Sequence, residues 1–220
     1  MNVLIIAPHP DDEILGVGGT IAKKVSQGHK VYVCVVTKGC APLFDEQAVH
    51  KGREECKKAD KYIGVEETVF LDFPAVMLEN VPRYELNGEL LELIERIKPE
   101  EVYIPHRGDM QIDHKIVVDS AMVALRPKYK HRVKRIFAYE TPSETGWDIP
   151  NTVNEFIPNV YEDISDTFDK KIEAVKMFES QIGEHPDARS VGTVEALARY
   201  RGSMVRLEAA EAFSLIRMII

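Results

Sequence analysis

The sequence His-Pro-Asp-Asp-Glu at positions 9–13 brings one imidazole and two adjacent carboxylates together at the end of an apolar run, residues 3–7. A short, bulky run that ends abruptly in polar residues is typical of a buried strand that delivers side chains to the edge of a sheet. An imidazole and a carboxylate can hold a metal ion, and a spare carboxylate can act as a base. The motif therefore predicts metal-assisted hydrolysis.

Two of these side chains, His9 and Asp12, are three residues apart and can face one ion. Catalytic zinc usually has three protein ligands plus a water molecule, so a third ligand is needed. His114 is the favoured third ligand, because it lies where a helix is expected to begin and where unpaired amides favour anionic ligands and deprotonated water. In the alternative interpretation, Asp109 caps that helix and His114 is a polar surface residue.

The other five histidines are weaker ligand candidates. His106 directly follows an expected strand, and His185 lies in a turn that could reach the pocket. The rest lie among charged or loop residues and are expected to be solvated: His29, His50 and His131.

Strand-like and helix-like segments alternate along the chain and must position these groups. Strands are expected at 3–7, 31–36, 68–71, 101–105 and 135–139. Helices are expected at 19–27, 51–63, 88–97, 116–125 and 164–181, with a mostly helical closing segment at 194–219. The alternation predicts an α/β fold, a single Rossmann-like domain over residues 1–220 with a mainly parallel sheet and helices on both faces. Ligands bind beyond the carboxyl ends of such strands, where His9 and the 106–114 segment should meet.

Composition excludes several classes of protein. The net charge of −8 argues against a nucleic-acid-binding surface, and no apolar run is long enough to span a membrane. The chain starts directly with a strand-like run, so we expect a cytoplasmic protein. Three cysteines without a C-x-x-C pair indicate neither a disulfide framework nor a zinc ribbon. The apolar residues at 213–220 leave a homo-oligomer open.

The sequence Ala-Pro-His-Pro-Asp-Asp-Glu at 7–13, with a distant Asp-His pair at 113–114, resembles the LmbE/PIG-L family of zinc-dependent N-acetylglucosamine deacetylases. The resemblance extends over nearly the whole chain, through shorter matches at 37–39, Arg53, 139–143, 198–202 and 210–213.

This resemblance implies a role for each matching residue. His9, Asp12 and His114 correspond to the zinc ligands of the family, and Asp11 corresponds to its general base. Arg53 corresponds to an arginine that lines the acetate end of the pocket in some relatives.

The chain departs from the family at Gln111, where many members carry a histidine. A glutamine amide can donate a hydrogen bond to an oxyanion but cannot act as a general acid. The proton for the leaving amine would then come from Asp11, from another residue such as His106, or from water.

The activity that follows is removal of the N-acetyl group from an N-acetylglucosamine-type sugar or glycoside, which releases acetate and an amino sugar. Zn²⁺ is the expected cofactor, although imidazole and carboxylate ligands also suit iron, cobalt or manganese. The expected partner is a small N-acetylated sugar, without nucleic acid or membrane. Residues 141–159 are expected to form a long loop that sets selectivity, with Trp147 stacking on the sugar.

Two other functions stay open. A phosphoesterase-like hydrolase would need more bridging ligands, and two metal ions per chain would indicate it. A non-catalytic metal- or carbohydrate-binding protein would not need the extra carboxylate of Asp11.

Glu13 either supports a ligand or stabilises the following helix N-terminus. The glycines at 16, 18 and 19 do not form G-x-G-x-x-G, so close helix–strand packing is favoured over a phosphate loop.

Overall fold

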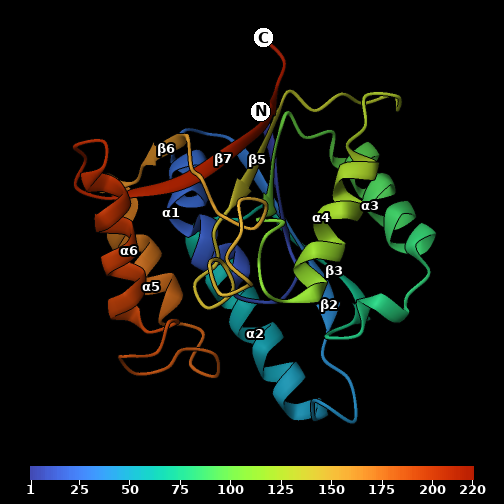
Figure 1. Cartoon of the computed structure of the whole chain (residues 1–220), viewed down its shortest axis with the longest axis horizontal. Helices are drawn as coiled ribbons and strands as arrows, with labels where there is room; N and C mark the ends of the chain where they lie inside the picture. Colours follow the sequence, from blue (N-terminus) through green and yellow to red (C-terminus); the bar gives the residue numbers. More distant parts are fainter.

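A single seven-stranded sheet forms the centre of the computed structural model, which describes all residues 1–220 (Figure 1). The strand order is β3-β2-β1-β4-β5-β7-β6. The strands are β1 (Asn2–Ala7), β2 (Lys30–Lys38), β3 (Glu67–Pro74), β4 (Glu101–Pro105), β5 (Arg135–Tyr139), β6 (Val160–Asp163) and β7 (Ala210–Met218). Strands β1 to β5 pair in parallel, and β7 pairs antiparallel with β5 and β6. The predicted α/β fold with a mainly parallel sheet is therefore confirmed.

Helices cover both faces of this sheet, as the alternation predicts. They are α1 (Asp12–Ser26), α2 (Glu46–Ile63), α3 (Arg83–Ile97), α4 (Ile112–Ala124), α5 (Phe168–Val175) and α6 (Val191–Ser203), with short 3-10 helices at Leu78–Asn80 and Ser165–Thr167. Helices α3 and α4 lie together on one face, while α1, α2, α5 and α6 lie on the other (Figure 1). None of the helices is both long and apolar enough to cross a membrane.

The alternation of side chains along β1 divides the core into two layers. Val3 and Ile5 pack into the layer of α1, α2, α5 and α6, whereas Leu4 and Ile6 pack into the layer of α3 and α4. All four are at most 1% exposed, because β1 is central and covered on both faces. The strand that leads into the 9–13 motif is thus held rigidly at the middle of the sheet.

Close contact between α1 and the sheet explains the glycines near the motif. A Cβ atom on Gly16 would lie 2.3 Å from Cδ2 of Tyr139, and one on Gly19 would lie 2.7 Å from Cδ1 of Ile164. Tyr139 in turn donates a hydrogen bond of 3.0 Å to the carbonyl oxygen of Ile6. The glycines allow close packing, as expected, and this packing places the start of α1 against the carboxyl end of β1.

The sequence prediction is wrong for the end of the chain. The segment 194–219 is not mostly helical: α6 ends at Ser203, and Ala210–Met218 form β7. Residues such as Ala, Glu, Leu and Met favour a helix locally, but pairing with β5 and β6 on both sides overrides that preference. The expected helix 164–181 is also shorter, since α5 ends at Val175, and α1 begins at Asp12 rather than near Gly19.

Candidate active site

The predicted ligands His9, Asp12 and His114 lie together at the carboxyl end of the sheet. His9 follows β1, Asp12 begins α1, and His114 lies in the first turn of α4. One ligand atom from each residue lies within 4.8 Å of the others. Oδ2 of Asp12 is 3.3 Å from Nδ1 of His9 and 3.4 Å from Nε2 of His114. Two elements adjacent in the sheet, β1 and β4, therefore bring distant parts of the sequence to one point, as the topology predicts.

A buried carboxylate fixes the orientation of His114. Nδ1 of His114 lies 2.8 Å from Oδ2 of Asp109, while the hydroxyl of Thr145 donates to Oδ1 of Asp109 at 2.5 Å. Because a carboxylate accepts, Nδ1 is the donor and Nε2 is left facing Asp12. The alternative in which Asp109 caps the helix is wrong, since Gln111 occupies the N-cap and Asp109 orients the imidazole.

A second carboxylate, Asp113, supports His9. Oδ2 of Asp113 is 3.2 Å from Nε2 of His9, and it also accepts the backbone N–H of Val76 at 2.5 Å. Oδ1 of Asp113 accepts the backbone N–H of Leu78 at 3.2 Å. Both histidines of the cluster thus have a buried carboxylate behind them, which is the usual support of metal-ligating histidines.

Two ligand atoms of the cluster are buried without a hydrogen-bond partner, Oδ1 of Asp12 and Nε2 of His114. Buried polar atoms without a partner are rare, and a cation at this point would satisfy both. Two imidazole nitrogens and a carboxylate oxygen suit a divalent metal and leave a coordination position for water. The residues present therefore fit a metal ion.

The pKa values of His114 and Asp12 depend on each other, and a metal ion at this point would compete with a proton for His114. Burial lowers the pKa of His114, but the charges of Asp12 and Asp109 outweigh it and raise the pKa to about 10. Burial likewise raises the pKa of Asp12, yet the charge of His114 brings it below its ordinary range. The two carboxylates thus favour the charged form of His114, and a metal ion bound to Nε2 would require its neutral form.

The candidate base, Asp11, lies beside this cluster and is 1% exposed. Its backbone has a φ of 123°, which is unusual for a residue other than glycine. Burial and the charge of Asp12 raise its pKa to about 7, although Arg189 acts in the opposite direction. A carboxyl group that titrates near neutral pH can both take a proton and return it.

The last residue of the motif, Glu13, supports the backbone of the base. Oε2 of Glu13 accepts the backbone N–H of Asp11 at 3.1 Å, and Oε1 accepts the thiol of Cys56 at 3.4 Å. Glu13 also lies in the first turn of α1. Its ligand atoms form a second close group with Cys56 and Asp60, but all three are buried and linked by their own hydrogen bonds. That group is a buried polar network beneath the candidate active site.

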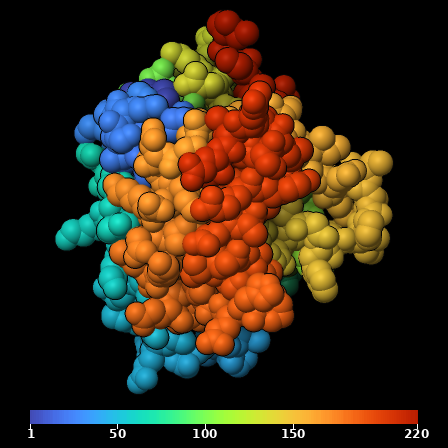
Figure 2. Space-filling model, turned by 90° about the vertical axis from the view of Figure 1, so that its left-hand side faces the viewer, coloured from blue at the N-terminus to red at the C-terminus, as the bar shows by residue number.

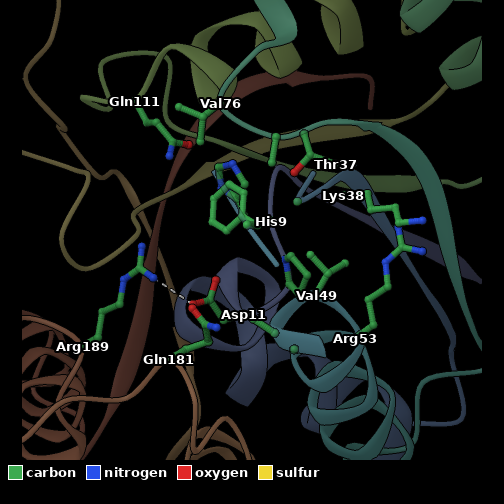
Figure 3. Close-up of a pocket in the computed structure, with 16 residues that line it drawn as sticks. His9, Asp11, Thr37, Lys38, Val49, Arg53, Val76, Gln111, Gln181 and Arg189 are labelled. Carbon is green, nitrogen blue, oxygen red and sulfur yellow. Dashed lines mark hydrogen bonds and ion pairs between the residues drawn. The ribbon is translucent and has the colours of Figure 1, made fainter. Parts of the chain in front are cut away.

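A cavity of about 210 Å³ opens above His9 and Asp11 (Figure 3). Gln111 lines it with a buried Oε1 that has no hydrogen-bond partner. Arg53 lines it from α2, where it pairs with Asp72 and lies 4.6 Å over the ring of Phe70. Figure 3 shows Gln111 and Arg189 on one side of the base, with Arg53 on the other.

Other predicted residues lie outside this cavity. Trp147 is 76% exposed on the 141–159 loop, which contains no helix or strand and projects from the molecule in Figure 2. His106 lies 3.0 Å from the carbonyl oxygen of Asn154, and His185 is exposed. Their roles in binding or proton transfer stay predictions without a contact to support them.

Four polar residues of the cavity have no role in the sequence prediction: Thr37, Lys38, Gln181 and Arg189. Lys38 belongs to the short match at 37–39, which points to the cavity without assigning a role. Gln181 and Arg189 lie in the segment between α5 and α6. Gln181 is the last residue of the expected helix 164–181, and no motif marks either residue. The orange and red residues of the C-terminal part of the chain form most of the face that Figure 2 presents.

Comparison with known proteins gives concordant results. Residues 4–125 match the sequence profile of the PIG-L family, GlcNAc-PI de-N-acetylase. The chain is 29% identical to an uncharacterized deacetylase, YaiS, of Escherichia coli over 81% of this chain and 91% of the relative. It is 26% identical to diacetylchitobiose deacetylase of Thermococcus kodakarensis over 98% of this chain and 83% of the relative. The crystal structure of the conserved protein TT1542 from Thermus thermophilus superposes with a TM-score of 0.81 at 26% identity, covering 99% of this chain and 96% of that one.

Proposed function

The chain belongs to the PIG-L family, and we propose that it hydrolyses the N-acetyl group of an N-acetylglucosamine-type sugar or glycoside to acetate and an amino sugar. One observation carries this proposal: a three-residue ligand cluster with unpartnered buried atoms lies directly beside a carboxyl group that faces a cavity. The names of the relatives, among them a diacetylchitobiose deacetylase, support an N-acetylated sugar as the substrate.

In this proposal His9, Asp12 and His114 hold one Zn²⁺ ion. When bound, such an ion polarises the acetyl carbonyl and lowers the pKa of a water molecule. Two of the ligands are imidazoles already oriented by Asp109 and Asp113, so little rearrangement is needed to bind.

The residues of the chain carry the proton transfers. Asp11 takes a proton from water as the water oxygen attacks the carbonyl carbon of the acetamido group. The side-chain amide of Gln111 lines the cavity and donates a hydrogen bond to the oxyanion that forms on the former carbonyl oxygen. Asp11 then returns its proton to the nitrogen as the C–N bond breaks. The reaction consumes one water and yields acetate and an amine.

Arg53 is proposed to contact the substrate from the opposite wall. Arg53 lines the cavity, and its Nε is buried without a hydrogen-bond partner. A sugar hydroxyl or carbonyl oxygen could accept from it. Nothing comparable supports Trp147, which is exposed on its loop.

The test is an acetate-release screen over N-acetylated amino sugars, with the protein stripped of metal and reloaded with Zn²⁺, Fe²⁺, Co²⁺ or Mn²⁺. We expect acetate from at least one sugar, one metal ion per chain, and loss of activity on stripping. Two metal ions per chain together with phosphate release from phosphoesters would favour the phosphoesterase instead. Tight binding of one Zn²⁺ without turnover of any sugar would favour a non-catalytic protein.

A further inference from the structure

Arg189 lies in the loop between α5 and α6 and reaches back to the motif at the start of the chain. Its Nη1 donates a hydrogen bond of 3.1 Å to Oδ2 of Asp11 (Figure 3). The two residues are 178 positions apart in the sequence, and no other side chain is hydrogen-bonded to the carboxyl group of Asp11. The side chains are 25% and 2% exposed, so this ion pair is largely protected from water.

The two oxygens of the Asp11 carboxyl group are in different situations. Oδ2 is held by Arg189, whereas Oδ1 is buried and has no hydrogen-bond partner. Asp11 lines the cavity, and Oδ1, which is buried and has no hydrogen-bond partner in the protein, is the oxygen that keeps its capacity to exchange a proton with a reacting water or the leaving amine. The hydrogen bond from Arg189 therefore determines which oxygen is free.

The backbone of Asp11 is fixed by other contacts. Its N–H donates to Glu13, and its carbonyl oxygen accepts the N–H groups of Ile14 and Leu15 at 3.0 and 2.9 Å. These contacts hold the positive φ of 123° but leave rotation of the side chain free. Only Arg189 restricts that rotation by a hydrogen bond.

Arg189 is itself held from the side of Gln111. Its Nε donates to the hydroxyl of Ser143 at 2.8 Å, and its Nη2 lies 3.6 Å from Oε1 of Glu144. Oε2 of Glu144 accepts the backbone N–H of Gln111 at 3.2 Å. A planar guanidinium can reach Asp11 and Ser143 at once, because its donors point in different fixed directions, while a lysine has a single nitrogen.

We propose that Arg189 is the positioning residue of this site: it holds one oxygen of Asp11 so that the other is left for the reacting water. Through Glu144, it also links the side chain of Asp11 to the backbone of Gln111. This role rests on the proposed function. The arginine acts through Asp11 and would not need to touch the substrate.

The test compares zinc-loaded wild type with Arg189→Ala, Arg189→Lys and Ser143→Ala. Arg107→Ala, which removes an exposed arginine paired with Asp119, is the matched control. We expect Arg189→Ala to lower kcat by ten- to a hundredfold with less than a threefold change in KM and an unchanged zinc content. Arg189→Lys should lie between this variant and wild type, and methylguanidinium should restore part of the activity of Arg189→Ala. A rise in KM at unchanged kcat would overturn the proposal, because it would make Arg189 a substrate contact.

A second readout does not depend on turnover. The thermal midpoints of the zinc-loaded Asp11→Asn, Arg189→Gln and double variants form a cycle that measures the contact directly. We expect the shift of the double variant to be smaller than the sum of the two single shifts, and additive shifts would overturn the inferred contact. If wild type released no acetate, the proposed function would fall, while non-additive shifts would still establish that Arg189 holds Asp11.

Discussion

Substitution of Asp60 by asparagine is expected to change how the stability of the protein depends on pH. Asp60 lies on α2, is 1% exposed, and accepts a hydrogen bond of 2.6 Å from the hydroxyl of Thr68. Burial raises the pKa of Asp60 from its ordinary 3.8 to about 7, even though the hydrogen bonds from Thr68 and Cys56 lower it. The folded protein therefore keeps a proton on Asp60 at pH values where the unfolded chain has lost it.

The sign and size of the effect follow from proton linkage. Between pH 4 and pH 7 the folded state binds more protons at this position, so its contribution to stability decreases as pH rises. The difference between 3.8 and about 7 corresponds to about 4 kcal/mol in total, of which about 3 kcal/mol falls between pH 5 and pH 8.5. Asparagine can still accept from Thr68 but has no proton to lose, so it removes this dependence.

Urea unfolding of the metal-free protein between pH 5 and pH 8.5 measures this prediction. Asp60→Asn should lower the free energy of unfolding by about 1–3 kcal/mol at every pH, because the amide N–H₂ of asparagine replaces Oδ1 of Asp60, a buried atom that has no hydrogen-bond partner. The free energy of unfolding of wild type minus that of Asp60→Asn should fall by about 3 kcal/mol across the range. Asp119→Asn, at an aspartate whose side chain is 43% exposed and pairs with Arg107 at the surface, should follow wild type at every pH. Parallel curves for wild type and Asp60→Asn would refute the reasoning.

Three further substitutions test other parts of the structure. Glu211→Gln should lower the free energy of unfolding by about 3–5 kcal/mol in urea titration, because it leaves the buried ammonium of Lys171 without its ion pair; a loss below about 1 kcal/mol would contradict this. Gly16→Ala should cost about 1–3 kcal/mol in the same titration, since its Cβ would lie 2.3 Å from Tyr139, and a stabilised variant would show that α1 can move away from the sheet. Gln111→His should change kcat less than threefold if the base returns the proton, whereas a large gain would mean that amine protonation limits the wild type.

The parallel part of the fold could be predicted from the sequence because each element carries its own signal. The run 3–7 is apolar throughout, as a strand covered on both faces must be, and Gly64 ends α2 in a left-handed conformation. Strand β7 has no such local signal. Its residues favour a helix, and only its remote partners, β5 and β6, make it a strand.

The same distinction applies to the site. His9, Asp11 and Asp12 are visible because one short motif contains them, and His114 is visible from its place at the expected start of a helix, which the resemblance to a family supports. Arg189 is not visible in this way, because a loop without periodicity brings it to the motif and nothing in its neighbourhood marks it. The sequence indicates Asp109 only as a candidate helix cap. Its hydrogen bond to the imidazole of His114 depends on the turn between β4 and α4, which only the structure describes.

The most direct test of the proposed function compares acetate release by zinc-loaded wild type and Asp11→Asn on a sugar that the wild type hydrolyses, with the zinc content of each sample measured in parallel. The expected result is one zinc ion per chain in both proteins and a loss of kcat of about 10²–10⁴-fold in Asp11→Asn, because the variant keeps the ligand cluster but lacks the base. An Asp11→Asn protein that holds its zinc and releases acetate at the rate of the wild type would contradict the mechanism.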